Sequence, residues 1–167
     1  MDAREVQQFR EVLAKSKTRF EERGSGGLTC KLGNYWDCSV LKLLRASWTN
    51  DRMDQVQNET GIFFSIWADE KANHNRAHYN IHALKLRQLK GYSITSRDFA
   101  NEFRNNLVRD SWPNVSVDYG PLTLMQGWID LHPKGPEEEI LVLMERFKNV
   151  GPVIDRLLGC RLKKTRR

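Results

Sequence analysis

Three histidines have the spacing in this sequence that most directly suggests metal chemistry. His74, His78 and His82 follow one another at intervals of four. On an α-helix this spacing would put three imidazoles on one face, as in the first ligands of a zinc site. In a β-strand, residues four apart lie about 13 Å from each other, so His78 and His82 would not share an ion. Because residues 78–89 have the composition of a strand, we predict loop and surface histidines and no metal site.

A short charged segment is the second candidate for chemistry. Asp69-Glu70-Lys71 follows an apolar stretch in the order acid, any residue, lysine, which ends a strand in magnesium-dependent nucleases. The upstream carboxylate of such a site would be Asp51 or Asp54. Three charged residues after a strand are also typical of a solvated turn. A metal-dependent hydrolase or nuclease that uses residues 69–82 is therefore an alternative and not the main interpretation.

Other signatures of catalysis or of cofactor binding are absent from the sequence. It contains no GxSxG, P-loop or GxGxxG motif. The three cysteines, Cys30, Cys38 and Cys160, form no CxxC pair, which argues against a disulfide framework and against a thiolate zinc site. Cys30 and Cys38 stand beside apolar residues, as small buried thiols do. We predict no cofactor.

Basic residues near the middle of the chain suggest a nucleic-acid contact. Lys85 and Arg87 would point the same way on the predicted strand, and three further basic or aromatic residues follow closely. Together with the C-terminal residues they would form a track for phosphates with a tyrosine for stacking. The other interpretation is an edge strand protected by lysine and arginine. The predicted nucleic-acid contacts are Lys85, Arg87, Lys90, Tyr92, Arg97, Arg161, Lys163 and Lys164.

The net charge of +6 is concentrated at the C-terminus. The last seven residues carry five positive charges, namely Arg161, Lys163, Lys164, Arg166 and Arg167. The remainder of the chain has 22 basic and 21 acidic residues and is nearly neutral. We therefore predict a single domain over residues 1–159 and a basic tail over 160–167, a feature that solubilises proteins or binds polyanions weakly.

Size and composition indicate one globular domain. The chain has 167 residues, of which 40% are hydrophobic and 29% charged, so it can bury a core and is not expected to be disordered. No apolar run is long enough for a membrane span, and the first thirty residues lack the core of a signal peptide. We expect a cytoplasmic protein without a membrane partner.

The N-terminal third predicts a helix and at least one strand. Residues 3–23 place apolar side chains three or four apart behind a capping Asp2, which is typical of an amphipathic helix that ends at the following glycines. Residues 28–32 alternate as a short strand does. Residues 35–48 fit a helix or a strand, because the periodicity suits both.

The remainder predicts two hairpins, each followed by a helix. Residues 62–68 and 78–89 are strand-like, a helix starts at Thr95, residues 115–119 and 122–131 are strand-like again, and a helix starts at Pro136. Gly151-Pro152 should interrupt or kink that last helix. The predicted class is α+β, a mostly antiparallel sheet of four to five strands with helices packed on it, in the order α-β-(α or β)-β-β-α-β-β-α.

Two of the predicted strands are apolar on both sides. Residues 62–68 put isoleucines and Phe64 on one face but Phe63 and Trp67 on the other, and residues 122–131 likewise carry Trp128 opposite other apolar residues. Either helices or the 35–48 segment cover the second side, or Phe63, Trp67 and Trp128 form an interaction face. The resulting hypothesis is a non-catalytic module that binds nucleic acid or a protein partner. The remaining alternative is a homodimer joined through Trp67 and Trp128.

Overall fold

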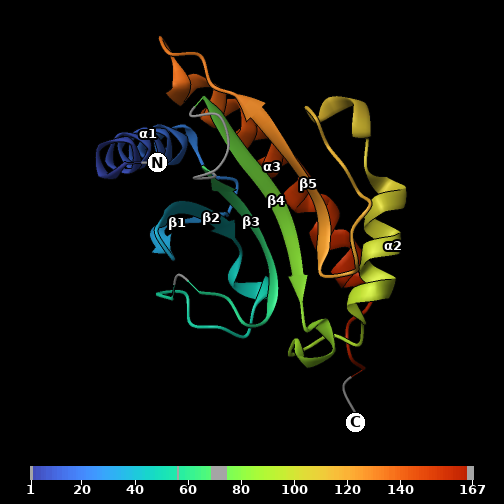
Figure 1. The fold of residues 1–167 in the computed structure, drawn as a ribbon. Coiled ribbons are helices and arrows are strands. Elements are labelled where there is room, and N and C mark those ends of the chain that lie inside the picture. The colour runs from blue at the N-terminus through green and yellow to red at the C-terminus, as the bar shows by residue number, and fades with distance from the viewer. Residues whose placement is uncertain (1, 56, 69–74, 165–167) are drawn as a thin grey trace.

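The computed structural model describes residues 2–55, 57–68 and 75–164. They form three helices and one five-stranded antiparallel sheet, which confirms the predicted α+β class (Figure 1). The strands lie in the sheet in their order along the chain, and each pairs with the next. Their bounds are β1 Thr29–Tyr35, β2 Cys38–Leu44, β3 Gly61–Trp67, β4 Arg76–Leu84 and β5 Thr123–Asp130.

The helices are α1 Ala3–Arg23, α2 Ser96–Asn106 and α3 Pro136–Gly159. α1 and α3 pack against each other over one face of the sheet, and α2 lies beside α3 at the β5 edge (Figure 1). Each helix start follows from local chemistry. Asp2 and Glu5 form a capping box on α1, and the acidic residues after Pro136 complement the dipole of α3. No helix in the described ranges has an apolar stretch long enough to cross a bilayer.

Alternation along the strands divides the sheet into two different faces. Phe64 of β3 points to the helices, where its ring stacks on that of Phe147 with 4.5 Å between centroids. Tyr79 of β4 fills the same layer, and its ring lies where a Cβ on Gly127 would stand. Alternate residues of a strand point to opposite faces, so Phe63 and Trp67 of β3 lie on the other face of the sheet. We call this second face the open face, because none of the three helices covers it (Figure 1).

The ambiguous segment 35–48 belongs to the sheet. It supplies β2 and then a 3-10 helix at Ala46–Trp48. β2 pairs with β1 on one side and with β3 on the other, so it is an interior strand. Its side chains are buried on both faces of the sheet, which explains its apolar run. The expectation that this segment or helices would cover the second side of the sheet is wrong.

One predicted strand is not formed, and another ends earlier than predicted. Residues 115–119 form no strand, and Ser116 alone pairs with Gln126 of β5. Asn114 has a positive φ of 51°, and the backbone of Asp118 donates to the Ser116 hydroxyl, so local turns replace the second hairpin. β4 ends at Leu84, because Lys85 adopts a left-handed conformation and a 3-10 helix, Leu86–Gln88, follows.

The sequence predicts an interruption or a kink at Gly151-Pro152, but the last helix continues through these residues without an interruption. A proline inside a helix costs about 3 kcal/mol because it removes a hydrogen bond and crowds the preceding turn. Three apolar side chains beyond it, Ile154, Leu157 and Leu158, are buried against the domain. Their burial is worth more than the proline costs, so the helix continues.

Candidate ligand cleft on the open sheet face

Cross-strand pairing sorts the side chains of the open face into rows. One row is polar and crosses all five strands, from Lys31 through Lys42, Ser65 and Asn80 to Gln126. The next row is largely aromatic and contains Trp67, His78 and Trp128. A face that carries both kinds of side chain side by side can offer stacking and hydrogen bonds to the same molecule.

A cleft of about 540 Å³ lies over the middle of this face. Its floor comes from β2, β3 and β4, one side from the β1–β2 hairpin and the other from residues 57–59. The lining residues are Tyr35, Trp36, Cys38, Val40, Lys42, Gln57, Asn58, Glu59, Phe63, Ser65, Trp67, Asn80, His82 and Leu84.

Aromatic side chains form the apolar part of the cleft. Phe63 is buried in its floor, and Trp67 stacks on His78 with 5.7 Å between ring centroids. Trp36 stands at the hairpin tip with 83% of its surface exposed and a positive φ of 54°. Left-handed backbone is uncommon for a bulky residue, so this tip holds a large aromatic group in an unfavourable conformation in full contact with solvent.

Lys42 is a buried cation in the floor of the cleft, with only 6% of its surface exposed. Its Nζ donates to Oδ1 of Asn58 at 3.2 Å and lies 4.6 Å from the centre of the Phe63 ring. Within the described residues it forms no ion pair. Burial lowers the pKa of Lys42 from 10.5 to about 8, against the opposing field of Asp51. An ammonium has three donors, so this group can still donate to a ligand.

The neighbouring Asn80 and His82 define a second polar group of the floor. Nδ1 of His82 lies 3.2 Å from the carbonyl oxygen of Leu122, which only accepts, so Nδ1 carries the proton. Burial lowers the pKa of His82, and its ring is therefore neutral, with Nε2 free to accept. Nδ2 of Asn80 donates to that Nε2 at 2.8 Å. This arrangement fixes the orientation of the Asn80 amide.

The other end of the Asn80 amide is unsatisfied. Oδ1 of Asn80 is buried, and no group in the described part of the chain donates to it. A buried polar atom without a hydrogen bond costs about 1–3 kcal/mol, and native proteins contain few of them. The cleft therefore places an acceptor that needs a donor in the same polar row as a cation that can donate.

Asp51, one of the two carboxylates that the nuclease alternative would use, positions one wall of the cleft. Its Oδ2 accepts from the backbone N–H groups of Glu59 at 2.8 Å and Thr60 at 3.1 Å, and from Nδ2 of Asn58. This fixes the loop whose Asn58 side chain meets Lys42. Asp54, the other carboxylate proposed upstream of a nuclease site, pairs with Arg52. The prediction for Asp69-Glu70-Lys71 lies outside the described residues, as does His74.

The two described histidines of the series lie on a strand, but they are half-buried and not the loop or surface residues that we predicted. His78 and His82 both belong to β4, which confirms the predicted strand. His78 stacks on Trp67, while His82 bonds to Asn80 and Leu122. Across the described ranges, no group of three or more histidine, cysteine, aspartate or glutamate side chains is arranged to hold a metal ion.

The predicted interaction residues Phe63, Trp67 and Trp128 share the open face, and the first two line the cleft. Trp128 lies beyond it, under the guanidinium of Arg76 at 3.6 Å from the ring centre, and Asp130 holds that arginine. Sequence reasoning missed the polar residues of the floor, Lys42, Ser65 and Asn80. The sequence pattern that could have identified them is a polar residue between apolar neighbours inside each strand.

The predicted basic residues gather at the end of the molecule where β4 finishes, α2 begins and α3 ends (Figure 1). Lys85, Arg87 and Arg97 line a second cleft there, of about 610 Å³. They converge through the turn at Lys85 and the start of α2, not as alternate residues of a strand as we predicted. We call this second cleft the basic cleft.

The C-terminal segment joins the same end of the molecule. The backbone N–H of Ser93 donates to the carbonyl of Arg161 at 2.8 Å, and that of Lys163 to Gly91 at 3.0 Å. Tyr92 therefore lies against this segment, in a bridge with Leu162. Arg161 pairs with Glu102 and so is less available to a ligand than predicted. Lys90, Lys163 and Lys164 are exposed.

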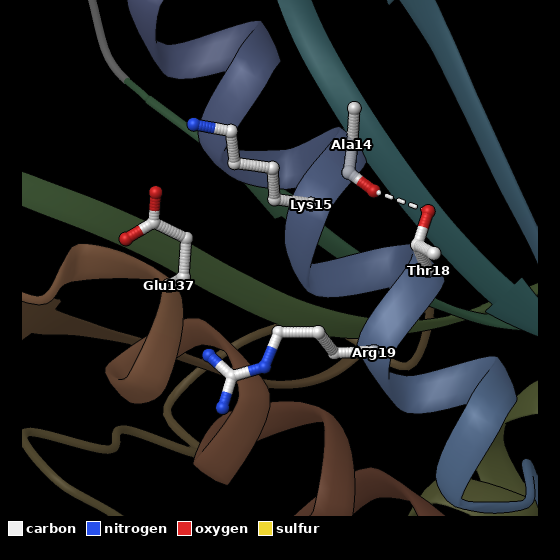
Figure 2. A pocket seen from close by; sticks show the side chains of 5 residues that line it. All are labelled: Ala14, Lys15, Thr18, Arg19 and Glu137. Atoms are coloured by element: carbon white, nitrogen blue, oxygen red, sulfur yellow. Dashed lines mark hydrogen bonds between the residues drawn. The ribbon is translucent and has the colours of Figure 1, made fainter.

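A third hollow lies between α1 and the start of α3 and has a volume of about 470 Å³. Figure 2 shows its lining of Ala14, Lys15, Thr18, Arg19 and Glu137. The Thr18 hydroxyl donates to the carbonyl of Ala14 in its own helix, and Arg19 pairs with Glu138. One polar group is thus used within α1 and another joins α1 to α3, so this hollow is a weaker candidate than the open-face cleft.

The three cysteines differ in burial. Cys30 is buried, and burial raises the pKa of its thiol to about 12, which keeps it protonated and unreactive. Cys38 is half-buried and lines the open-face cleft, so the predicted burial is confirmed for Cys30 and not for Cys38. Cys160 is exposed at the end of α3.

Comparison of the chain with protein-family models, with curated proteins and with solved structures found no match. Any functional conclusion therefore rests on the geometry described above.

Proposed function

We propose that the protein is a binding module whose open-face cleft holds a planar heterocycle of the nucleobase type. The observation that carries this proposal is Oδ1 of Asn80, a buried acceptor in the floor of the cleft to which no described residue donates. A ligand with an N–H group would satisfy it. The hydrogen bond to this ligand would also remove the free-energy penalty of a buried oxygen without a donor.

The chemistry of the lining supports this class of ligand. Nucleobases carry a hydrogen-bond donor beside an acceptor on one edge of a flat ring. The donor would meet Oδ1 of Asn80, and the acceptor would meet the ammonium of Lys42. Phe63 and Trp67 offer the flat surfaces on which a ring stacks. A volume of about 540 Å³ lies within the range of small-molecule sites.

The proposal keeps the predicted interaction module and changes its primary ligand. A protein partner or a second copy on Trp67 and Trp128 is less well supported, because His78 stacks on one ring and Arg76 covers the other. Light scattering over a concentration series tests this point. We expect a monomer at all concentrations, and a dimer that Trp67→Ser disrupts would favour the interface instead.

Titration with the four common ribonucleosides, followed by tryptophan fluorescence, tests the proposed ligand. We expect at least one nucleoside to bind the wild-type protein and to bind Asn80→Leu at least tenfold more weakly, because the variant loses the acceptor at nearly constant volume. A derivative methylated at the donor nitrogen of that base should show the same loss on the wild type.

Gln126→Leu is the matched control. Gln126 is the cross-strand neighbour of Asn80 on the same face but does not line the cleft. Its replacement should leave the affinity unchanged. Failure of all four nucleosides to bind, or equal affinities for wild type and Asn80→Leu, would overturn the proposal.

A further inference from the structure

The basic cleft gathers positive charge that the fold does not use. Lys85, Arg87 and Arg97 are all exposed on its lining, and none of them forms an ion pair within the described ranges. The acidic side chain on this lining is Asp98. Three cations and one carboxylate leave a local excess of positive charge in a hollow of about 610 Å³.

Two of these cations occupy positions that are unfavourable for the folded protein. Arg97 is the second residue of α2, where the helix dipole disfavours a positive charge. Lys85 has φ 48° and ψ 45°, a left-handed conformation that costs energy for a lysine. Neither residue gains a compensating ion pair among the described side chains. Positions with such costs are found where a ligand repays them.

The basic cleft adjoins the open-face cleft. Leu84 lines the open-face cleft, and the next residue, Lys85, lines the basic one. The ring of His82, in the floor of the first, lies 3.2 Å from the carbonyl oxygen of Leu122, which lines the second. A molecule with a ring in one cleft can therefore extend a charged group into the other.

We propose that the basic cleft binds the phosphate groups of a nucleotide, either free or within a single nucleic-acid strand, whose base occupies the open-face cleft. The position of the base rests on the proposed function above. The phosphate contact rests on Lys85, Arg87 and Arg97. Arginine binds phosphate oxygens through paired N–H groups, and lysine adds a mobile point charge.

The C-terminal segment favours a strand over a free nucleotide. Backbone bonds from Ser93 and to Gly91 bring Arg161 and Lys163 to the same end of the molecule as the basic cleft. Further phosphates of a strand would meet the exposed Lys90, Lys163 and Lys164 there. A strand should consequently bind more tightly than its mononucleotide, and its affinity should fall more steeply with salt.

The test compares two charge-matched triple variants by fluorescence polarisation, with a short labelled single strand as the probe. In the first variant Lys85→Asn, Arg87→Gln and Arg97→Gln are combined. Asparagine tolerates the left-handed backbone at position 85, so the fold should persist. In the control Arg4→Gln, Lys15→Gln and Arg23→Gln remove three exposed charges from α1. This helix lies far from the end of β4 and the start of α2, which supply the basic cleft (Figure 1).

We expect the first variant to bind the strand at least tenfold more weakly at low salt and to lower the slope of log affinity against log salt by about 2–3. The control should keep most of the affinity. The first variant should also melt at the same or a higher temperature than the wild type, because it loses unfavourable charges. Equal losses in both triple variants would show binding by net charge alone and would overturn the inference.

Competition separates this inference from the proposed function. A nucleoside, its monophosphate and inorganic tripolyphosphate are each added to the wild type. Displacement of the labelled strand by the monophosphate at a lower concentration than by the nucleoside supports the phosphate contact. A monophosphate that binds as tightly as the strand would identify the free nucleotide as the ligand. If the nucleoside binds and phosphate adds nothing, the inference fails while the proposed function stands. If tripolyphosphate binds but Asn80→Leu has no effect on any probe, the base site fails and the basic cleft alone survives.

Discussion

The two faces of the sheet are built from the same strands but follow opposite rules. The face under α1 and α3 is largely apolar, and its sheet residues are bonded where they are polar, as when the Tyr79 hydroxyl donates to the carbonyl of Pro113 at 2.6 Å. The exception at its edge is Arg45, which pairs with Asp155 of α3 but buries its Nε without a partner among the described residues. The open face buries Lys42, Ser65 and Asn80, and no side chain or backbone group in the described ranges donates to Oδ1 of Asn80. Buried polar groups cost stability unless they are fully bonded. The helix face therefore accounts for the fold, and the open face bears costs that a ligand would explain.

Removal of a ring from each face should produce the largest contrast in stability. Phe64→Ala takes away a ring that stacks on Phe147 and contacts Trp48, so the free energy of unfolding should fall by about 3–5 kcal/mol. Phe63→Ala enlarges a cleft that already opens to solvent, so it should cost about half as much. Urea unfolding of both variants measures the difference, and equal losses would contradict the division between the faces.

The buried lysine should make stability depend on alkaline pH. The pKa of Lys42 is about 8 in the folded protein and 10.5 when the side chain is not buried, as in the unfolded chain. Between these two pH values the unfolded chain therefore binds more protons than the folded protein. Stability from this group must then rise with pH from about 8 to 10.5 and be lowest below pH 8. Lys42→Met should be more stable than the wild type by about 1–3 kcal/mol at pH 7.

That advantage of Lys42→Met should shrink toward zero near pH 10, as measured by urea unfolding at several pH values. The difference between the two proteins cancels the titration of other groups, including Cys30, whose raised pKa makes stability fall at high pH. A constant difference from pH 7 to pH 10 would contradict the burial of a charged ammonium in the floor of the cleft.

The rim of the cleft should matter least for stability. Trp36 is almost fully exposed and has a positive φ, so Trp36→Asn should change the free energy of unfolding by no more than about 0.5 kcal/mol, or raise it slightly. Affinity for the nucleoside should fall severalfold, because an aromatic surface of the cleft is lost. A large loss of stability would show instead that this hairpin tip packs against the domain.

Local patterns were enough to predict the class of the fold and most of its elements. The periodicity of residues 3–23 and the start of α3 at Pro136 depend on neighbours in sequence, and both helices are confirmed. The identity of β2 and the loss of a strand at 115–119 depend on pairing between distant segments. Such tertiary effects override local propensity.

The candidate site was predictable only in part, for the same reason. Phe63 and Trp67 stood out because apolar residues on both sides of a strand need an explanation. Lys42 and Asn80 became visible as a site only once the strand register placed them in one row. The convergence of Lys85 and Arg97 required the turn that ends β4, which the apolar pattern of residues 78–89 concealed.

The most direct test of the account is the free energy of unfolding of Asn80→Leu without any ligand, measured against the wild type and Gln126→Leu. If the Asn80 amide is kept for a ligand, the variant should stay within about 1 kcal/mol of the wild type, because the loss of an unsatisfied buried oxygen offsets the loss of the bond that Nδ2 donates to Nε2 of His82. A loss of more than about 1 kcal/mol relative to both proteins would show that the amide holds the sheet together, and the central claim would be wrong.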